Sequence, residues 1–142
     1  MVVRTTEESM GFARVTRNIH TGENPGMKFG IVKARPGRVS TDQIAKEIAE
    51  TTTLTKAEAK FAMASAMEII SKYVCMGYKV DVEDFGTFEA KISAEFQPTL
   101  AQVTLDTIRS IGMGFRPCKE VSERLKNVHR FFTDMDITGL QP

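Results

Sequence analysis

The sequence has few of the features that quickly assign a protein to a class. Its two cysteines, Cys75 and Cys118, lie far apart and do not form the dense pattern of a disulfide-stapled domain, so we expect reduced thiols. Its hydrophobic runs never approach the roughly 18 residues of a membrane span, and its opening residues are too polar for a secretory signal. The formal net charge of +1 creates no overall field for nucleic acid or an anionic membrane. We therefore expect a soluble, cytoplasmic protein without a membrane partner.

Motifs for catalysis and metal binding are also missing. There is no phosphate-binding loop, no Ser-His-Asp set and no dinucleotide fingerprint. His20 and His129 are distant in sequence and have no second ligand at metal spacing. Asp81 and Glu83 alternate on the outward side of a predicted strand, which favours solvated carboxylates over a hard-cation site that would include Asp84. The sequence therefore predicts a protein that is not an enzyme and has no cofactor or metal.

The chain is long enough for one compact domain with extensions, and its charges are unevenly distributed. Residues 1–39 carry seven Lys or Arg and three Asp or Glu, residues 40–130 carry 12 and 13, and residues 131–142 carry none and two. The basic excess therefore lies in the N-terminal part. An electrostatic partner would have to meet a local patch.

Local patterns predict a hairpin followed by two helices. "FARVTRNI" and "MKFGIVKAR" are strand-like and flank "HTGENPG", whose Gly, Asn and Pro favour a turn. Ser40 begins a capping-box pattern and predicts a helix over about 42–50. "TTTLT" ends that helix, because successive β-branched residues are poor helix formers. Thr55 caps a second helix that runs to about residue 76 and stops at Gly77.

The second half of the chain predicts strands around a sharp corner and then a last helix. "YKVDVE" alternates like a half-exposed strand, "DFGTF" forms the corner, and "AQVTLDTIRSIGMGF" is a β-rich return. "PCKEVSERLKNVHRFF" predicts a final helix with Pro117 at its start. We expect Cys75 to be a small buried residue. Cys118 has no base or resolving cysteine near it, so we do not expect a nucleophile there.

This order of elements, with two motifs, resembles the HU and integration host factor family. The corner Asp84-Phe85-Gly86-Thr87-Phe88 is similar to the usual "GFGTF" or "GFGNF", and Phe115-Arg116-Pro117-Cys118-Lys119 to the "FRPG" that opens the family's last helix. The resemblance covers roughly residues 40–130. It implies an α+β, HU/IHF-like fold with two N-terminal helices, a three-stranded antiparallel sheet with a β-arm, and a C-terminal helix. Residues 1–39 look like the hairpin extension of HU-like proteins of Bacteroidetes and their phages, and residues 131–142 form a tail.

The resemblance also implies an intertwined dimer whose β-arms embrace DNA and insert a proline wedge into the minor groove. Between Phe88 and Phe115, however, this arm departs from the family's Arg- and Lys-rich pattern. It carries two cations, Lys91 and Arg109, against three carboxylates. Because non-specific DNA binding is nearly all electrostatic, we expect weak DNA binding with a gentle salt dependence.

Most candidate DNA-binding residues have an alternative interpretation. Pro98 is either a wedge or a turn proline beside an edge strand. Arg116 and Lys119 either hold a phosphate near the last helix or are ordinary solvated charges. The hairpin cations either face phosphates or protect an edge strand from aggregation. They are Arg14, Arg17, Lys28, Lys33, Arg35 and Arg38. The candidate DNA-binding set is Arg14, Arg17, Arg35, Lys91, Pro98, Arg109, Arg116 and Lys119.

The second helix is apolar around most of its circumference, so we expect it to pack on its own sheet and on another subunit. The predicted interface residues are Phe61, Met63, Met67, Ile70 and Val74. The polar ends, residues 1–11 and 133–142, are expected to be held by other chains. These features favour an oligomeric protein–protein assembly component, such as a phage virion or tail ring protein, that binds itself and other structural proteins. The alternative is an HU-like architectural protein that binds and bends double-stranded DNA.

Overall fold

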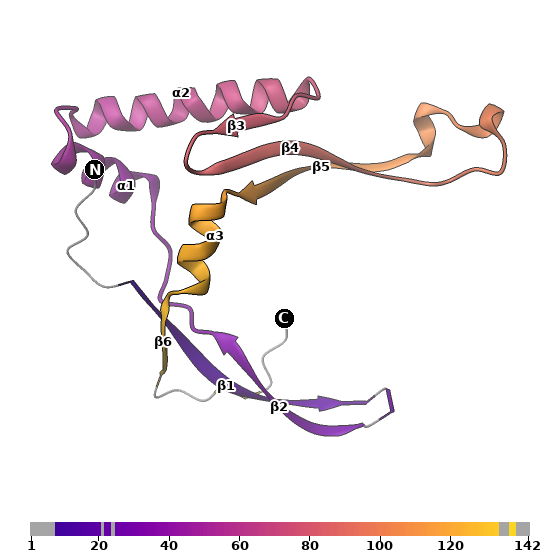
Figure 1. The fold of residues 1–142 in the computed structure, drawn as a ribbon, viewed down its shortest axis with the longest axis horizontal. Coiled ribbons are helices and arrows are strands. Elements are labelled where there is room, and N and C mark those ends of the chain that lie inside the picture. Colours follow the sequence, from indigo (N-terminus) through magenta and orange to yellow (C-terminus); the bar gives the residue numbers. More distant parts are fainter. Residues whose placement is uncertain (1–7, 21, 24, 134–136, 139–142) are drawn as a thin grey trace. The chain divides into compact units, whose positions relative to one another are not determined.

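The computed structural model describes residues 8–20, 22–23, 25–133 and 137–138 (Figure 1). The fold is mixed α+β, and the chain divides into two compact units. One unit is Ser40–Leu125, and the other combines both ends of the chain, Met1–Val39 and Lys126–Pro142. This grouping differs from the sequence-based division at residue 130, because the segment from Lys126 onwards belongs with the N-terminal unit.

The unit Ser40–Leu125 begins with helices α1 (Thr41–Thr51) and α2 (Lys56–Cys75). The hydroxyl of Ser40 accepts a hydrogen bond from the Gln43 amide at 3.2 Å, which satisfies one of the free N–H groups at the start of α1. The predicted capping box of α2 is confirmed: Thr55 and Glu58 each accept a hydrogen bond from the other's backbone amide. Between the helices, the Thr52 hydroxyl donates to the carbonyl of Ile48 at 2.8 Å, so the threonine run does end α1 through its side chains.

The end of α2 leads directly into a three-stranded antiparallel sheet in the order β3-β4-β5. Gly77 takes the left-handed conformation, with φ of 91°, that was expected to stop the helix. The strands are β3 (Val80–Val82), β4 (Gly86–Ala94) and β5 (Ile108–Pro117). In Figure 1, β4 and β5 run together past the end of α2 and form the arm.

The far end of the arm differs from the predicted continuous β-rich return. Residues Leu100–Gln102 and Leu105–Thr107 form two short 3-10 turns, η1 and η2, and β5 begins only at Ile108. The Glu95 amide donates to the carbonyl of Thr107 at 3.0 Å, closing the strand pair just before these turns. The hydroxyl of Thr107 also donates to the carbonyl of Thr104, a local bond that favours a turn over a strand.

The last helix is shorter than predicted. Helix α3 spans Lys119–Lys126, and Pro117 is the last residue of β5 instead of the first residue of the helix. The sequence "HRFF", which we placed in the helix, is strand β6 (His129–Phe132). Aromatic residues fit a half-exposed sheet better than a helix end, and β6 gains backbone partners by pairing in parallel with Ser9–Phe12. Tertiary pairing therefore decides the conformation of this segment.

The unit that combines both ends of the chain, which we call the N-terminal unit, contains a four-stranded sheet. Strands β1 (Ser9–Ile19) and β2 (Gly26–Lys33) are antiparallel, and β6 and β7 (Ile137–Thr138) pair in parallel with successive parts of β1. Residues 9–11 are thus held by β6 of their own chain, so the expectation that other chains hold residues 1–11 is wrong for these three residues. Residues 1–7 and most of 133–142 lie outside the described part of the structure.

Very little of the described chain is buried. Among the described residues no large side chain is fully covered. The buried hydrophobic residues are small or medium-sized: Ala13, Val15, Ala45, Ala59 and Val74. Many large apolar side chains are instead exposed on α2, on the arm and on the hairpin. Cores of folded domains normally bury such residues. The isolated chain therefore presents unusually extensive apolar surface, which is typical of a protein that functions in association with others.

Candidate functional site

The Phe-Gly corner forms the base of the arm. The rings of Phe85, Phe88 and Phe115 lie 4.7 to 6.4 Å apart, and the Cys118 amide donates to the carbonyl of Phe85 at 2.8 Å. Gly86 is buried, and a Cβ there would meet the carbonyl oxygen of Arg116 and the ring of Phe115. Only glycine allows this close approach. The two family-like motifs thus contact each other and fix where the arm leaves the sheet.

The arm has even less available positive charge than its sequence suggests. The guanidinium of Arg109 binds the Glu95 carboxylate, with Nη2 to Oε1 at 2.6 Å and Nε to Oε1 at 3.0 Å. The stem of Lys91 lies over the open face of Gly114, where a Cβ would collide with it. Only the exposed ammonium of Lys91 is left to meet a phosphate, since Arg109 is already paired.

The far end of the arm is apolar, which sequence reasoning missed. We call residues 95–107 the arm tip. Phe96 is fully exposed, at 103% of its reference area, and three further large aliphatic side chains on the tip are exposed: Leu100, Val103 and Leu105. The tip has two carboxylates and no Lys or Arg. The continuous β-rich return predicted from the sequence would not gather these apolar residues on one exposed turn; Pro98 lies among them and is also exposed.

Apolar side chains also line the arm nearer to α2. Ile92 pairs with Ile111, and Ala90 with Met113, on one side of the β4–β5 ladder. Together with the end of α2, from Val74 to Gly77, they surround an open hollow of about 490 Å³. Such an apolar recess suits an apolar side chain of a partner.

Helix α2 exposes two of the five predicted interface residues. Phe61 is 76% exposed and Met67 54%, while Met63 and Ile70 are partly covered and Val74 is buried. Ile69 and Tyr73 extend the exposed apolar surface. Cys75 is exposed as well, so the expectation that it is buried is wrong for this chain: it lines the hollow and is not part of the core. The exposed surface of α2 thus remains available to a second subunit.

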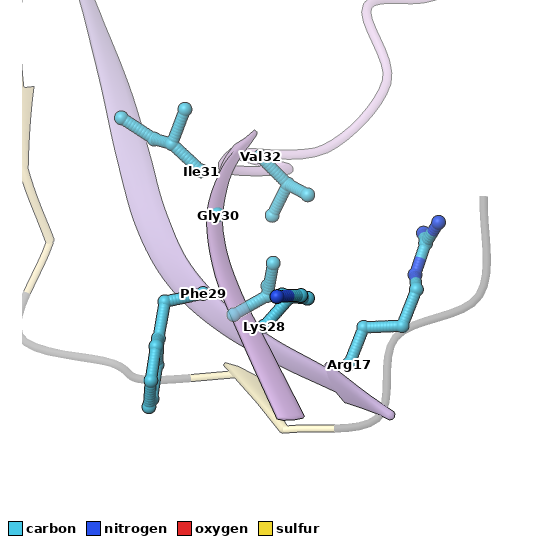
Figure 2. Close-up of a pocket in the computed structure, with 7 residues that line it drawn as sticks. Arg17, Lys28, Phe29, Gly30, Ile31 and Val32 are labelled. Atoms are coloured by element: carbon cyan, nitrogen blue, oxygen red, sulfur yellow. The ribbon is translucent and has the colours of Figure 1, made fainter. Parts of the chain in front are cut away.

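The hairpin cations do not gather on one face. Partners across the antiparallel ladder share a face, so Arg14 lies with Ile31, and Arg17 lies with Lys28 on the opposite face. Figure 2 shows Phe29 and Ile31 projecting to one side of β2, and Arg17 and Val32 to the other, around a shallow hollow of about 270 Å³. Arg35 and Arg38 follow β2 in the connection to α1. The predicted basic surface is therefore divided by the sheet.

The cations near α3 are also partly engaged. Lys119 lies 4.0 Å from Glu123, one helical turn on, and Arg116 is exposed beside Thr87 in the β4–β5 register. The Cys118 amide already donates a hydrogen bond to the carbonyl of Phe85, so it is not free to bind a phosphate. These contacts favour solvated surface charges over a phosphate site at this helix start.

No metal-binding or membrane-spanning element is found in the described residues. They contain no group of three or more His, Cys, Asp or Glu placed to hold a metal ion, and Asp81 accepts a hydrogen bond from the Thr87 hydroxyl at 2.7 Å. The helices of this part of the chain are too short or too polar to cross a bilayer.

The pKa of the Asp42 carboxylate is lowered by neighbouring lysines. A hydrogen bond from Lys60, together with the positive charges of Lys60 and Lys56, holds the pKa of Asp42 below its ordinary value.

Comparisons with known proteins agree with this fold. A family described as "HU domain fused to wHTH, Ig, or Glycine-rich motif" matches residues 12–132. Among solved structures, one from Bacteroides vulgatus described as "a Putative bacterial DNA binding protein" aligns with a TM-score of 0.55 at 11% identity, covering 92% of this chain and 50% of that one. The chain thus spans half the length of that protein, and the likeness is one of fold. No curated protein matches the sequence significantly.

Proposed function

The chain belongs to the family of HU domains fused to wHTH, Ig or glycine-rich modules, and from this premise we propose that it is a non-enzymatic assembly protein. In this proposal it pairs with itself through α2 and uses its arm to contact protein instead of DNA. The observation that carries the proposal is the chemistry of the arm. Its tip exposes four large apolar side chains, and one of its two cations is already bound to Glu95.

The free energy of burying apolar side chains favours protein as the partner of this arm. A DNA duplex offers mainly phosphate charge to an arm that tracks its backbone, and each phosphate neutralised needs a free cation. Fully exposed apolar side chains gain little from phosphates. Burying a Phe or Leu side chain against protein, in contrast, contributes about 1.5–3 kcal/mol. The tip therefore has more to gain from an apolar protein surface.

The α2 surface supports the self-pairing part of the proposal. A helix of a lone domain needs one apolar stripe, whereas α2 exposes Phe61, Met67 and Ile69 beyond the side that covers its own sheet. The hollow bounded by Val74, Ile92 and Met113 lies at the end of this helix. A second copy could cover both features in one continuous apolar interface. The finer picture of a ring in a phage particle finds no support in the fold or in the comparisons, and we do not propose it.

DNA binding is the second candidate, favoured by the family and by the description of the structural neighbour. Contacts would then come from Arg14, Arg17 and Arg35 in the N-terminal unit more than from Lys91 or Pro98 in the arm. Because these cations are few and divided between faces, we expect weak, sequence-independent binding.

A salt titration of binding to a short fluorescent duplex tests the proposal. We expect weak binding whose logarithmic dependence on salt is gentle, since each neutralised phosphate contributes a slope of about −0.9. The matched variant is Pro98→Ala, which should leave DNA affinity and DNA shape unchanged. Tight binding at physiological salt, with a steep slope and loss of DNA bending in Pro98→Ala, would overturn the assembly function in favour of DNA bending.

A further inference from the structure

The sheet of the N-terminal unit has an apolar face with positive charge at its margins. We define the hairpin face as the side of the β1–β2 ladder that carries Arg14, Thr16, Met27, Phe29, Ile31 and Lys33. Phe29 is 83% exposed, and Met27 and Ile31 are more than half exposed. The Arg14 guanidinium lies 4.1 Å from the ring centroid of Phe132, in β6, so that ring borders the same face. The hairpin face thus combines three exposed apolar side chains with two cations and no carboxylate.

The arm tip has the opposite charge and a similar apolar character. It presents Phe96, Leu100, Val103 and Leu105, with Glu95 and Asp106 as its charged groups. Glu95 is paired with Arg109, so Asp106 gives the tip its uncompensated negative charge. The two surfaces lie in different units of the chain. Both are far more apolar than scattered surface residues would make them.

We propose that the arm tip of one copy docks on the hairpin face of a second copy. Contact between two tips would bring the carboxylates of both copies together, and contact between two hairpin faces would bring Arg14 and Lys33 of both copies together. Like charges across an interface are costly, whereas tip against face pairs opposite charges around apolar centres. The charges therefore select a heterologous contact over either symmetric one.

A heterologous contact has consequences for assembly. Each copy offers one tip and one face, so the contact repeats and generates a closed ring or an open filament. Combined with pairing through α2, it would link dimers to one another. The inference rests on the proposed assembly function and names the partner of the arm in it as a further copy of the chain.

Capture between complementary variants tests the contact. A tip variant, Phe96→Ser with Leu105→Ser, retains an intact face, and a face variant, Phe29→Ser with Ile31→Ser, retains an intact tip. These side chains are exposed in the chain, so the variants should fold normally, which circular dichroism can verify. Immobilised tip variant should capture the face variant. It should capture a chain carrying all four substitutions roughly tenfold to a hundredfold less well.

The fourfold variant is the matched control, because it differs from the face variant only at the tip. Subunit exchange through α2 affects both equally, so a difference in capture isolates the tip-to-face contact. Equal capture would overturn the inference. Equal capture together with weak DNA binding that depends gently on salt would reject only the tip-to-face contact and leave the assembly function in place. Tight DNA binding with a steep salt dependence would reject the assembly function itself.

A charge exchange gives a second, independent measurement. Asp106→Lys, added to the face variant, should weaken its capture by immobilised tip variant several-fold, and capture should return when the immobilised tip variant also carries Arg14→Glu and Lys33→Glu. Failure of the exchanged pair to recover would contradict the assignment of opposite charges across this contact.

Discussion

Replacing Gly86 by Ala tests the account of the arm base. Gly86 is buried beside the Phe85, Phe88 and Phe115 rings, and an added methyl would meet the backbone oxygen of Arg116 as well as the Phe115 ring. A backbone atom in a strand ladder cannot move without disturbing the register between β4 and β5. Overpacking of this kind costs about 1–3 kcal/mol. Alanine removes some unfolded-state entropy and offsets roughly 0.5–1 kcal/mol of that cost.

We therefore expect Gly86→Ala to lower the free energy of unfolding by about 1–2 kcal/mol, because the backbone collision outweighs the entropy gain. Urea denaturation followed by helical circular dichroism measures it, since α1 and α2 lie in the same unit as Gly86. The matched control is Gly112→Ala in β5, where an added Cβ meets nothing within 4 Å in this chain. It should be neutral or slightly stabilising. Because Gly112 borders the hollow near α2, both variants should be compared at several protein concentrations. Equal effects of the two substitutions at low concentration would refute the close-packed corner.

Three further outcomes are expected. Met67→Glu should convert the dimer to a monomer or unfold the chain, because it places a charge in the proposed α2 interface. Glu68→Gln on the same helix should leave the dimer intact. Light scattering that finds a well-folded wild-type monomer would reject the interface. The Asp42 carboxyl should titrate below 3.8 by NMR, and Lys60→Met should raise that pKa; because the folded-state pKa is lowered, its stabilising contribution is present above the unfolded-state pKa and is lost as pH falls through the folded-state value. An unchanged Asp42 titration in Lys60→Met would contradict the assignment of the lowered pKa to Lys60. Glu95→Gln should free the guanidinium of Arg109 from its ion pair. In any complex where the arm touches DNA, the logarithmic dependence of DNA affinity on salt should then become steeper by up to about 0.9 per chain. An unchanged salt dependence would mean that the arm does not meet phosphates.

Local chemistry made helices α1 and α2 predictable. The capping hydroxyls of Ser40 and Thr55, the threonine run and the left-handed Gly77 act within a few residues, so their effects can be read from adjacent positions. The corner could be recognised because glycine between two aromatic residues is needed for close approach to β5. The poor charge of the arm was also visible in the sequence, although its ion pair between Glu95 and Arg109 was not.

Pairing between distant segments accounts for the errors. "HRFF" follows a helical pattern and became β6 only because Ser9–Phe12, far away in sequence, supplies its hydrogen-bond partners. Strand alternation divides Arg14 from Arg17, and the β1–β2 register places Lys28 with Arg17; a count of charges contains neither. The shared exposure of the apolar arm tip follows from the two 3-10 turns that replace the predicted strand.

The most direct test of the central claim places a photo-crosslinking phenylalanine analogue, benzoylphenylalanine, at position 96 of the full chain. This side chain is fully exposed, so the replacement should not disturb folding. The protein is irradiated with labelled duplex DNA present at low salt, where electrostatic binding is strongest. The account predicts protein–protein products and no protein–DNA product from this position. Crosslinking of position 96 to the duplex, with no protein–protein product, would contradict it.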